Sequence, residues 1–295
     1  MLWIPFTIIA AAAQTARNAM QRELTATLGT VGATLVRFLF GFPFAILFLI
    51  GVCLITQSGL PTPSWVYWPW ILLGAAGQVA ATTLMLAAMN DRSFVVTTAY
   101  IKTEPVQTAL FGLILLGDKL TPMLAVAILI ATGGVVVMAV KPGAAQVNGL
   151  RPTIMGIVAG GLFGISAISF RGAILSLNLP DQFVLASTFT LAVSLVVQAA
   201  ILLIYLVVAK PLVLRAIFKA WRPSMFAGFM GAFASQFWFL GFAIASAASV
   251  RTLALIEVLF AQGVTKFAFK QKTTLREIVG TVMIVVGVVL LIWAH

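Results

Sequence analysis

The sequence predicts an all-α membrane protein with ten transmembrane helices, arranged as two inverted repeats of five helices. Of the 295 residues, 62% are hydrophobic and only 8% are charged, whereas a soluble domain carries about 25% charged residues. A chain so poor in charge cannot cover a water-facing surface. Ten apolar stretches are long enough to cross a bilayer, which takes about 20 residues each. The two halves of the chain also resemble each other.

The ten expected spans are separated by short connections that contain glycine and proline, such as QSGLPTPS and KPGAAQVNGLRP. None of these connections is long enough to form a soluble domain. The first apolar stretch is interpreted as a span and not as a signal peptide, because no Lys or Arg precedes it. In order, the spans are expected at 3–20, 31–56, 66–89, 94–116, 121–140, 153–176, 183–208, 224–244, 247–266 and 275–294.

The repeat is visible as charged residues that recur at a nearly constant shift. Arg17 and Arg171 lie 154 residues apart, and Glu104 and Glu257 lie 153 apart. Each half ends in an apolar helix marked by glycine, and a shift of this kind over five helices indicates an internal repeat. Because five is odd, the second copy enters the membrane from the opposite side. The expected repeat units are 1–142 and 149–295, with a binding site between them near the middle of the bilayer.

Several function classes are disfavoured by composition. One cysteine, Cys53, and one histidine, His295, cannot build an internal disulfide or a zinc site. We therefore expect no metal and no cofactor, and no phosphate-binding loop of an ATPase is present. The net charge of +11 is better explained by basic cytoplasmic loops than by nucleic-acid binding, because the basic residues are scattered between spans.

Short motifs resemble a known family. The first half contains QTARNAMQRELTATLGTVGATLVRFLFGFPFAILFLI and, later, EPVQTALFGLILLGDKLTPMLAVAILIATGGVVV. This layout resembles the ten-helix, EamA-like branch of the drug/metabolite transporter superfamily. Arg37-Phe38 matches an Arg-aromatic pair early in helix 2 of the family, and Pro105 matches a proline in helix 4. Gly117-Asp118 matches a Gly-acid pair before helix 5, in which the family usually has Glu instead of Asp. The second half departs from the pattern, with Phe269-Lys270 in place of the Gly-acid pair and no counterpart of Pro105.

This resemblance implies a multi-pass inner-membrane transporter of small polar metabolites or amino acids, usually exported. The expected partners are therefore a small-molecule substrate and the lipid bilayer, with the protein as a monomer or a homodimer. A scaffold or receptor subunit is disfavoured by the near lack of soluble loops. An intramembrane enzyme is disfavoured because no Ser/His set, Asp pair or HExxH motif appears.

The membrane orientation has two conflicting indications. The positive-inside rule favours both termini outside the cytoplasm, because alternate loops hold twelve basic residues and the remaining loops hold only Lys119. The family resemblance implies both termini inside. The twelve are Arg22, Arg92, Lys141, Arg151, Lys210, Arg215, Lys219, Arg222, Lys266, Lys270, Lys272 and Arg276.

Seven charged residues are expected at membrane depth, where each costs roughly 2.5–3.5 kcal/mol even on a lenient scale. Glu104 and Glu257 are the candidates for proton or substrate coupling, because they lie near the centres of spans in equivalent positions of the two repeats. The candidate counter-charges for the substrate are Arg17, Lys102, Arg171 and Arg251. Arg37 lies near the end of its span, so its side chain is expected to reach the membrane interface.

Polar residues at helical spacing predict a wet cavity. Thr97, Tyr100, Glu104 and Thr108 recur at steps of three or four and would share one helix face. Pro105 would free a backbone carbonyl of the preceding turn, which needs a partner or water in a membrane. The same cavity is expected to be lined by Gln78, Gln236 and Trp238.

Two interpretations of the buried charges remain open. They can form ion pairs that hold helices together, for example Arg17 or Arg171 with a glutamate. Alternatively, the surplus of five bases over two acids is matched by a substrate anion held by Arg, or is reduced because Lys102 is neutral. The aromatic residues around Trp238 can likewise be a substrate wall or ordinary lipid-facing and core residues.

The function expected is secondary active transport of an amino acid or organic anion by alternating access, with proton coupling as a hypothesis. The alternative is a proton-coupled exporter of cationic drugs or other lipophilic compounds, in which the two glutamates bind the cation.

Overall fold

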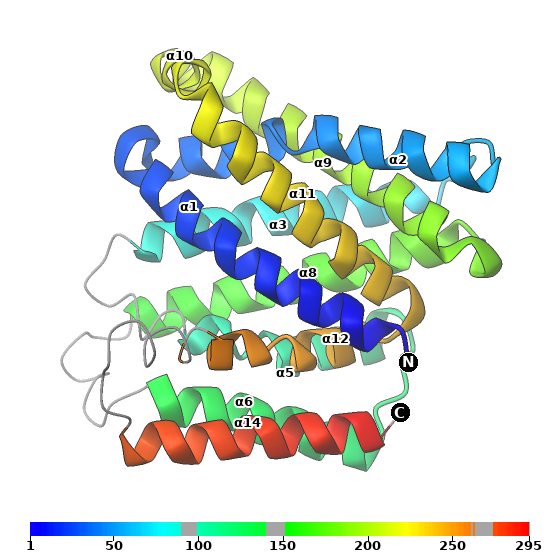
Figure 1. The fold of residues 1–295 in the computed structure, drawn as a ribbon, viewed down its shortest axis with the longest axis vertical. Coiled ribbons are helices and arrows are strands. Elements are labelled where there is room, and N and C mark those ends of the chain that lie inside the picture. The colour runs from blue at the N-terminus through cyan, green and yellow to red at the C-terminus, as the bar shows by residue number, and fades with distance from the viewer. Residues whose placement is uncertain (90–98, 140–150, 261, 263–273, 295) are drawn as a thin grey trace.

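The computed structural model describes residues 1–89, 99–139, 151–260, 262 and 274–294. The described residues form helices and connections (Figure 1). Seven helical stretches among them are long and apolar enough to cross a membrane. Three expected spans, at 3–20, 94–116 and 247–266, are not among these seven.

The first two expected spans form one folded-back unit. Helix α1, Trp3–Leu39, contains a sharp bend at Gly29, whose φ is 69°. Glycine adopts this left-handed backbone region without steric cost, so the chain can reverse there. The second limb of α1 continues into α2, Phe42–Thr56, and the apolar stretch Glu23–Thr56 includes the bend.

The expected spans at 94–116 and 247–266 are interrupted, which corrects the expectation of two continuous helices. Lys102 and Thr103 form a turn, after which α5 runs over Glu104–Leu115. Helix α12, Ala247–Leu253, is likewise followed by a turn at Ala254 and Leu255 before helix resumes at 256–260. Glu104 and Glu257 therefore lie at helix starts and not at helix centres.

The two interruptions share two hydrogen bonds of the same kind. In the first, the Thr103 N–H donates to the Tyr100 carbonyl and the Val106 N–H to the Thr103 carbonyl, both at 3.1 Å. In the second, Leu255 donates to Thr252 at 3.1 Å and Val258 to Leu255 at 3.0 Å. In both places the N–H group bonds to the carbonyl of the third preceding residue, and the equivalent bonds lie 152 residues apart in the sequence. Glu104 and Glu257 are 153 residues apart, so Glu257 lies one position later in its interruption than Glu104 does.

The remaining described helices complete the bundle. Helices α1 and α11 pack together, as do α3 and α8, and α5 packs against α8 and α12. Close α5–α8 packing depends on glycine in α8, because a Cβ on Gly164 would lie 3.3 Å from the backbone nitrogen of Thr108. The bounds are α3 Tyr67–Met89, α6 Pro122–Ala139, α8 Arg151–Ser176, η1 Pro180–Gln182, α9 Phe183–Ala209, α10 Pro211–Lys219, α11 Trp221–Ile244 and α14 Leu275–Trp293.

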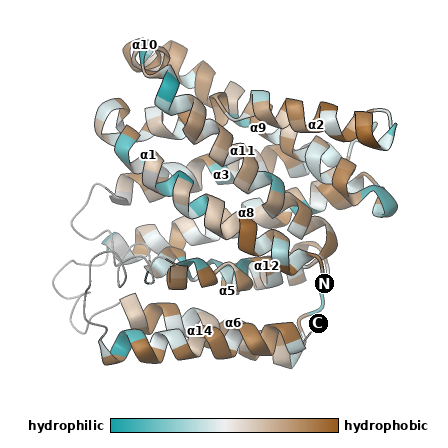
Figure 2. Ribbon diagram, in the orientation of Figure 1, coloured by the Kyte–Doolittle hydropathy of each residue, from teal (hydrophilic) through white to brown (hydrophobic). Residues whose placement is uncertain are grey.

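Helices α6 and α14 form a pair at one side of the bundle (Figure 1). A Cβ on Gly134 would lie 2.7 Å from the Gly280 carbonyl oxygen, so the backbones approach closely through glycine. Figure 2 shows mainly hydrophobic residues along both helices. Large apolar side chains such as Leu129 and Val282 are exposed there, as expected for helices that face lipid in a multi-pass membrane protein.

The two ends of the bundle differ in charge among the described residues. Both termini lie at one end (Figure 1), and Lys119 follows α5 at that end. The opposite end holds α10 and the first residues of α8 and α14 (Figure 1), which carry Arg151, Arg215, Lys219 and Arg276. The direction in which these ends face across the membrane stays a prediction.

Candidate functional site

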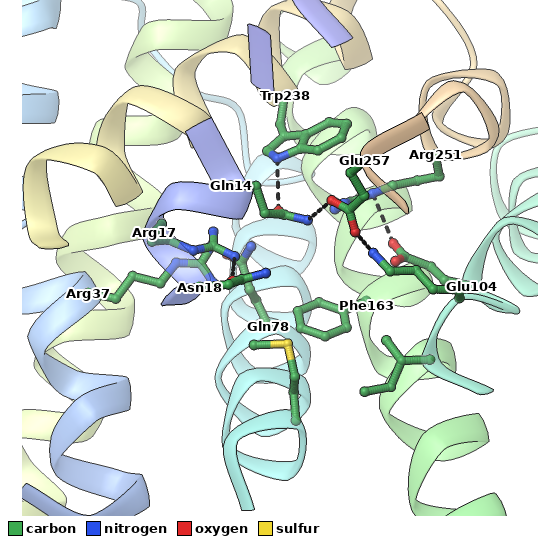
Figure 3. A pocket seen from close by; sticks show the side chains of 13 residues that line it. Gln14, Arg17, Asn18, Arg37, Gln78, Glu104, Phe163, Trp238, Arg251 and Glu257 are labelled. Atoms are coloured by element: carbon green, nitrogen blue, oxygen red, sulfur yellow. Dashed lines mark hydrogen bonds and ion pairs between the residues drawn. The ribbon is translucent and has the colours of Figure 1, made fainter. Parts of the chain in front are cut away.

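A cavity of about 170 Å³ lies where the two interrupted helices meet α1, α3, α8 and α11 (Figure 3). Its lining combines buried charges, amides and apolar side chains. The described lining residues are Gln14, Arg17, Asn18, Arg37, Gln78, Met85, Ile101, Lys102, Glu104, Phe163, Trp238, Arg251 and Glu257.

Two crossed ion pairs connect the interrupted helices. Lys102 Nζ pairs with Glu257 Oε1, and Arg251 Nε lies 2.9 Å from Glu104 Oε1. Each pair joins a base on one interrupted helix to an acid on the other. The Arg251 Nε–H is not aligned with the carboxylate oxygen, and neither atom has a hydrogen-bond partner among the described residues. That contact is therefore a charge–charge attraction without a good hydrogen bond.

The helix interruption explains the position of Glu104. As the first residue of α5, its carboxylate lies at the positive end of the helix dipole, which favours an anion. Pro105 occupies the first turn of α5, where its missing N–H would have no helical partner anyway. The expectation that Pro105 frees a carbonyl within a continuous helix is wrong for this reason.

A chain of polar contacts extends from Trp238 to Glu257 (Figure 3). The Trp238 Nε1–H donates to Gln14 Oε1 at 3.1 Å, and Gln14 Nε2 donates to Glu257 Oε2 at 3.1 Å. The Arg251 guanidinium lies 4.6 Å from the Trp238 ring centroid, within range of a cation–π interaction. Trp238 is thus a buried residue that orders both a glutamate and an arginine.

Arg17 and Arg37 lie at the other side of the cavity. Arg17 Nη2 donates to Asn18 Oδ1 at 2.7 Å, and Arg37 Nη1 donates to Thr82 Oγ1 at 3.2 Å. Each residue is 2% exposed. The interpretation of Arg37 as a residue that reaches the membrane interface is therefore wrong, because the second limb of α1 faces the cavity at this position.

Arg171 occupies a different place from its counterpart Arg17. Its Nη1 donates to the carbonyl oxygens of Phe242 at 2.6 Å and Ala245 at 2.5 Å, where α11 ends. Its Nη2 lies 3.5 Å from Asp118 Oδ1. Arg171 is not among the described residues that line the cavity, and its assignment as a substrate counter-charge stays a prediction. It also does not pair with a glutamate, and neither does Arg17, within the part of the chain that the structure describes.

The predicted polar stripe is only partly brought to the cavity. Thr97 lies outside the described residues, and the described lining does not include Tyr100, Thr108 or Gln236. Thr108 Oγ1 donates to the Glu104 carbonyl at 2.8 Å, and Gln236 Nε2 donates to Thr188 Oγ1 at 2.8 Å. Gln78 and Trp238 do line the cavity, as expected.

Sequence reasoning missed several lining residues, chiefly Gln14, Asn18, Met85 and Phe163. Gln14 lies three residues before Arg17 and four before Asn18, so these polar side chains lie on neighbouring parts of one helix face. This spacing on α1 could have identified Gln14 and Asn18 as lining residues. Met85 and Phe163 are ordinary apolar residues in apolar helices, and no pattern distinguishes them from lipid-facing or core positions.

Comparison with known proteins identifies the kind of protein that this chain resembles. Residues 1–140 match the EamA-like transporter family, which confirms the resemblance to the drug/metabolite transporter superfamily. No curated protein matches the chain. Among 28 matching chains of solved structures, a crystal structure of a protein with 15% sequence identity has a TM-score of 0.66, with 99% of this chain and 99% of that chain covered. At this identity the likeness shows the fold alone.

Proposed function

We propose that this protein is a membrane transporter of the drug/metabolite type that moves a small polar metabolite across the inner membrane by alternating access. The match of residues 1–140 to the EamA-like transporter family supports this proposal. The substrate is an amino acid or an organic anion, and export is the proposed direction. Ten spans would form two inverted repeats, 1–142 and 149–295, with the substrate site between them.

The observation that carries this proposal is the pair of crossed ion pairs at the two helix interruptions. Interrupted helices that meet near the middle of a membrane are the usual frame of a substrate site in secondary transporters. Lys102 pairs with Glu257 and Arg251 with Glu104, so both ion pairs would join the first proposed repeat to the second. Opening the cavity to either side would require these contacts to rearrange, which links the site to the conformational change.

The ion pairs also suggest how transport is coupled. A proton that binds Glu104 or Glu257 removes the negative charge and releases Arg251 or Lys102 from its partner. The released base is then free to bind an anionic group of the substrate. Proton and substrate would thus act on the same contacts, and this is the proposed basis of proton coupling.

The alternative of a cationic-drug exporter has less support. A cation needs an available carboxylate, yet each cavity glutamate already faces a base. The described lining carries four basic residues and two acids, so the cavity attracts anions more than cations.

Exchange in proteoliposomes tests the proposal. Vesicles that contain the purified protein are loaded with a mixture of amino acids and organic acids, and mass spectrometry identifies the compounds that leave faster than from protein-free vesicles. We expect a few of these compounds to exchange, and Glu104→Gln and Glu257→Gln to abolish the response to a pH gradient. Glu23→Gln is the control, because Glu23 is exposed. If no compound exchanges faster than in protein-free vesicles, the transport proposal fails; if exchange is the same with and without a pH gradient, proton coupling fails.

A further inference from the structure

We infer that Arg17 and Arg37 together form a subsite for a doubly charged anion, so that the substrate is a small dianion and not an amino-acid zwitterion or a cation. This inference rests on the proposed transport function and specifies its substrate class. It assigns a role to two charges that the crossed ion pairs leave unmatched.

The two arginine side chains run side by side along α11. A Cβ on Gly231 of α11 would lie 3.1 Å from Arg37 Cγ and 3.6 Å from Arg17 Cδ. The missing side chain at Gly231 therefore leaves room for both arginines. Figure 3 shows that their guanidinium groups converge beside Asn18 and point into the cavity. The bend at Gly29 brings the two residues together, because they lie on opposite limbs of α1.

Their hydrogen-bonding capacity is only partly used. Arg17 and Arg37 are each 2% exposed, yet Arg17 Nε and Nη1 and Arg37 Nε have no hydrogen-bond partner among the described residues. The contacts that they do make, to Asn18, Thr82 and the Phe38 ring, are with neutral groups. Two adjacent buried cations with free N–H groups and no described carboxylate are strongly unfavourable unless an anion joins them. Guanidinium groups bind carboxylate and phosphate oxygens through paired N–H donors.

Among the described lining residues, each carboxylate that could bind an ammonium group already faces a base of this protein. Glu104 and Glu257 face Arg251 and Lys102. The Gln14 oxygen accepts from Trp238, and the Gln78 oxygen accepts from Gln198 at 2.8 Å. An amino acid could place its carboxylate on the arginines, but its ammonium would then have to compete with Arg251 or Lys102 for a glutamate. A dianion avoids this conflict and neutralises both arginines.

The cavity has room for a small ligand. Its volume of about 170 Å³ accommodates a compound as small as succinate or inorganic phosphate. A dicarboxylate and a phosphate group offer the same chemistry, two negative charges on oxygen atoms, and the test must separate them.

Binding to the purified wild-type protein tests the charge requirement directly. Isothermal titration calorimetry in detergent compares succinate, inorganic phosphate, monomethyl succinate and glutamine. Monomethyl succinate is the matched control, because it keeps the carbon chain and loses one charge. We expect succinate or phosphate to bind at least ten times more tightly than monomethyl succinate, and the tighter of the two identifies the anion. Equal binding of succinate and its monomethyl ester, or binding of glutamine without either dianion, would overturn the inference.

Variants assign the charge requirement to these residues. Arg17→Gln and Arg37→Gln should each weaken binding of the preferred dianion at least tenfold and change monomethyl succinate binding much less. Arg222→Gln is the control, since Arg222 is an exposed arginine beside Trp221. Arg37→Lys keeps the charge and serves where Arg37→Gln fails to fold; it should weaken dianion binding by loss of the paired donors. Unchanged dianion affinity in folded Arg17 and Arg37 variants would overturn the inference.

Proteoliposome exchange separates failure of this inference from failure of the transport proposal. Exchange of glutamine or another zwitterion without exchange of any dianion refutes the dianion subsite and leaves the transport function intact. Exchange of a dianion that is lost in Arg17→Gln supports both.

Discussion

The ion pair between Glu104 and Arg251 predicts a large and specific stability effect. Glu104→Gln keeps the size of the side chain and removes its charge, which leaves the Arg251 guanidinium buried without its described acidic partner. Arg251 and Glu104 side chains are only 8% and 11% exposed, and Nε and Oε1 lie 2.9 Å apart. Water therefore cannot easily replace the missing carboxylate.

The expected loss follows from the geometry. Two unit charges about 4 Å apart attract by about 4 kcal/mol at an effective dielectric constant near 20, and removal of one member of a buried pair costs about 3–5 kcal/mol. Because the Arg251 N–H is not aligned with the carboxylate oxygen, we expect a loss of about 3 kcal/mol, at the lower end. The double variant Glu104→Gln/Arg251→Gln removes both charges, so no unpaired charge stays buried. It should recover about 2 kcal/mol of the free energy of unfolding that Glu104→Gln alone loses.

The measurement is a double-mutant cycle on the free energy of unfolding, from reversible denaturation by SDS in mixed micelles. Glu23→Gln provides the control at an exposed position and should change the free energy of unfolding by less than about 0.5 kcal/mol. If Glu104→Gln behaves like this control, or if the effects of the two single substitutions simply add, then the ion pair does not stabilise the fold and the reasoning is refuted.

Three further predictions use the same unfolding measurement. Arg171→Gln removes the charged donor of two hydrogen bonds to the Phe242 and Ala245 carbonyls. It should lower the free energy of unfolding by about 3 kcal/mol, since such bonds contribute roughly 1.5–3 kcal/mol each. A loss under about 1 kcal/mol would contradict a stabilising role of Arg171 at the end of α11. Gly134→Ala places a Cβ 2.7 Å from the Gly280 carbonyl oxygen and should lower the free energy of unfolding by about 1–3 kcal/mol. The control Gly133→Ala meets only the flexible end of Met283 and should lower it less. Equal losses for the two variants would argue against close α6–α14 packing. Gln14→Leu removes the acceptor of the Trp238 N–H and should lower the free energy of unfolding by about 1–3 kcal/mol. Adding Trp238→Phe removes the unsatisfied N–H and should restore part of this loss. If the double variant restores none of it, the loss has another origin.

The sequence predicted the class of protein and much of its layout, because those properties depend on local composition. Hydropathy alone located α3, α6, α8, α9, α11 and α14 to within a few residues. Charges in apolar surroundings marked Arg17, Lys102, Glu104, Arg251 and Glu257, all of which line the cavity, since a buried charge is costly enough to be conspicuous in any membrane sequence. Lys102 and Glu104 are close in the sequence, yet each pairs with a residue of the other interrupted helix.

The helix interruptions had only an ambiguous signal. Pro105 is compatible with a kinked continuous helix and equally with the first turn of a new one. No proline lies at the second interruption, where Ala254 and Leu255 form the turn. Packing of α5 against α8 and α12 selects the interrupted form, and local propensity does not.

Only the tertiary structure decided which charges meet. Lys102 and Glu257 are 155 residues apart in the sequence, and their pairing depends on how α5 and α12 cross. Arg17 and Arg171 occupy similar sequence positions, but one faces the cavity and the other binds the end of α11 and Asp118. Arg37 joins Arg17 only because α1 reverses at Gly29. The composition of the chain thus determined that charges would be buried, whereas the packing of distant helices determined which of them are paired and which are left for a ligand.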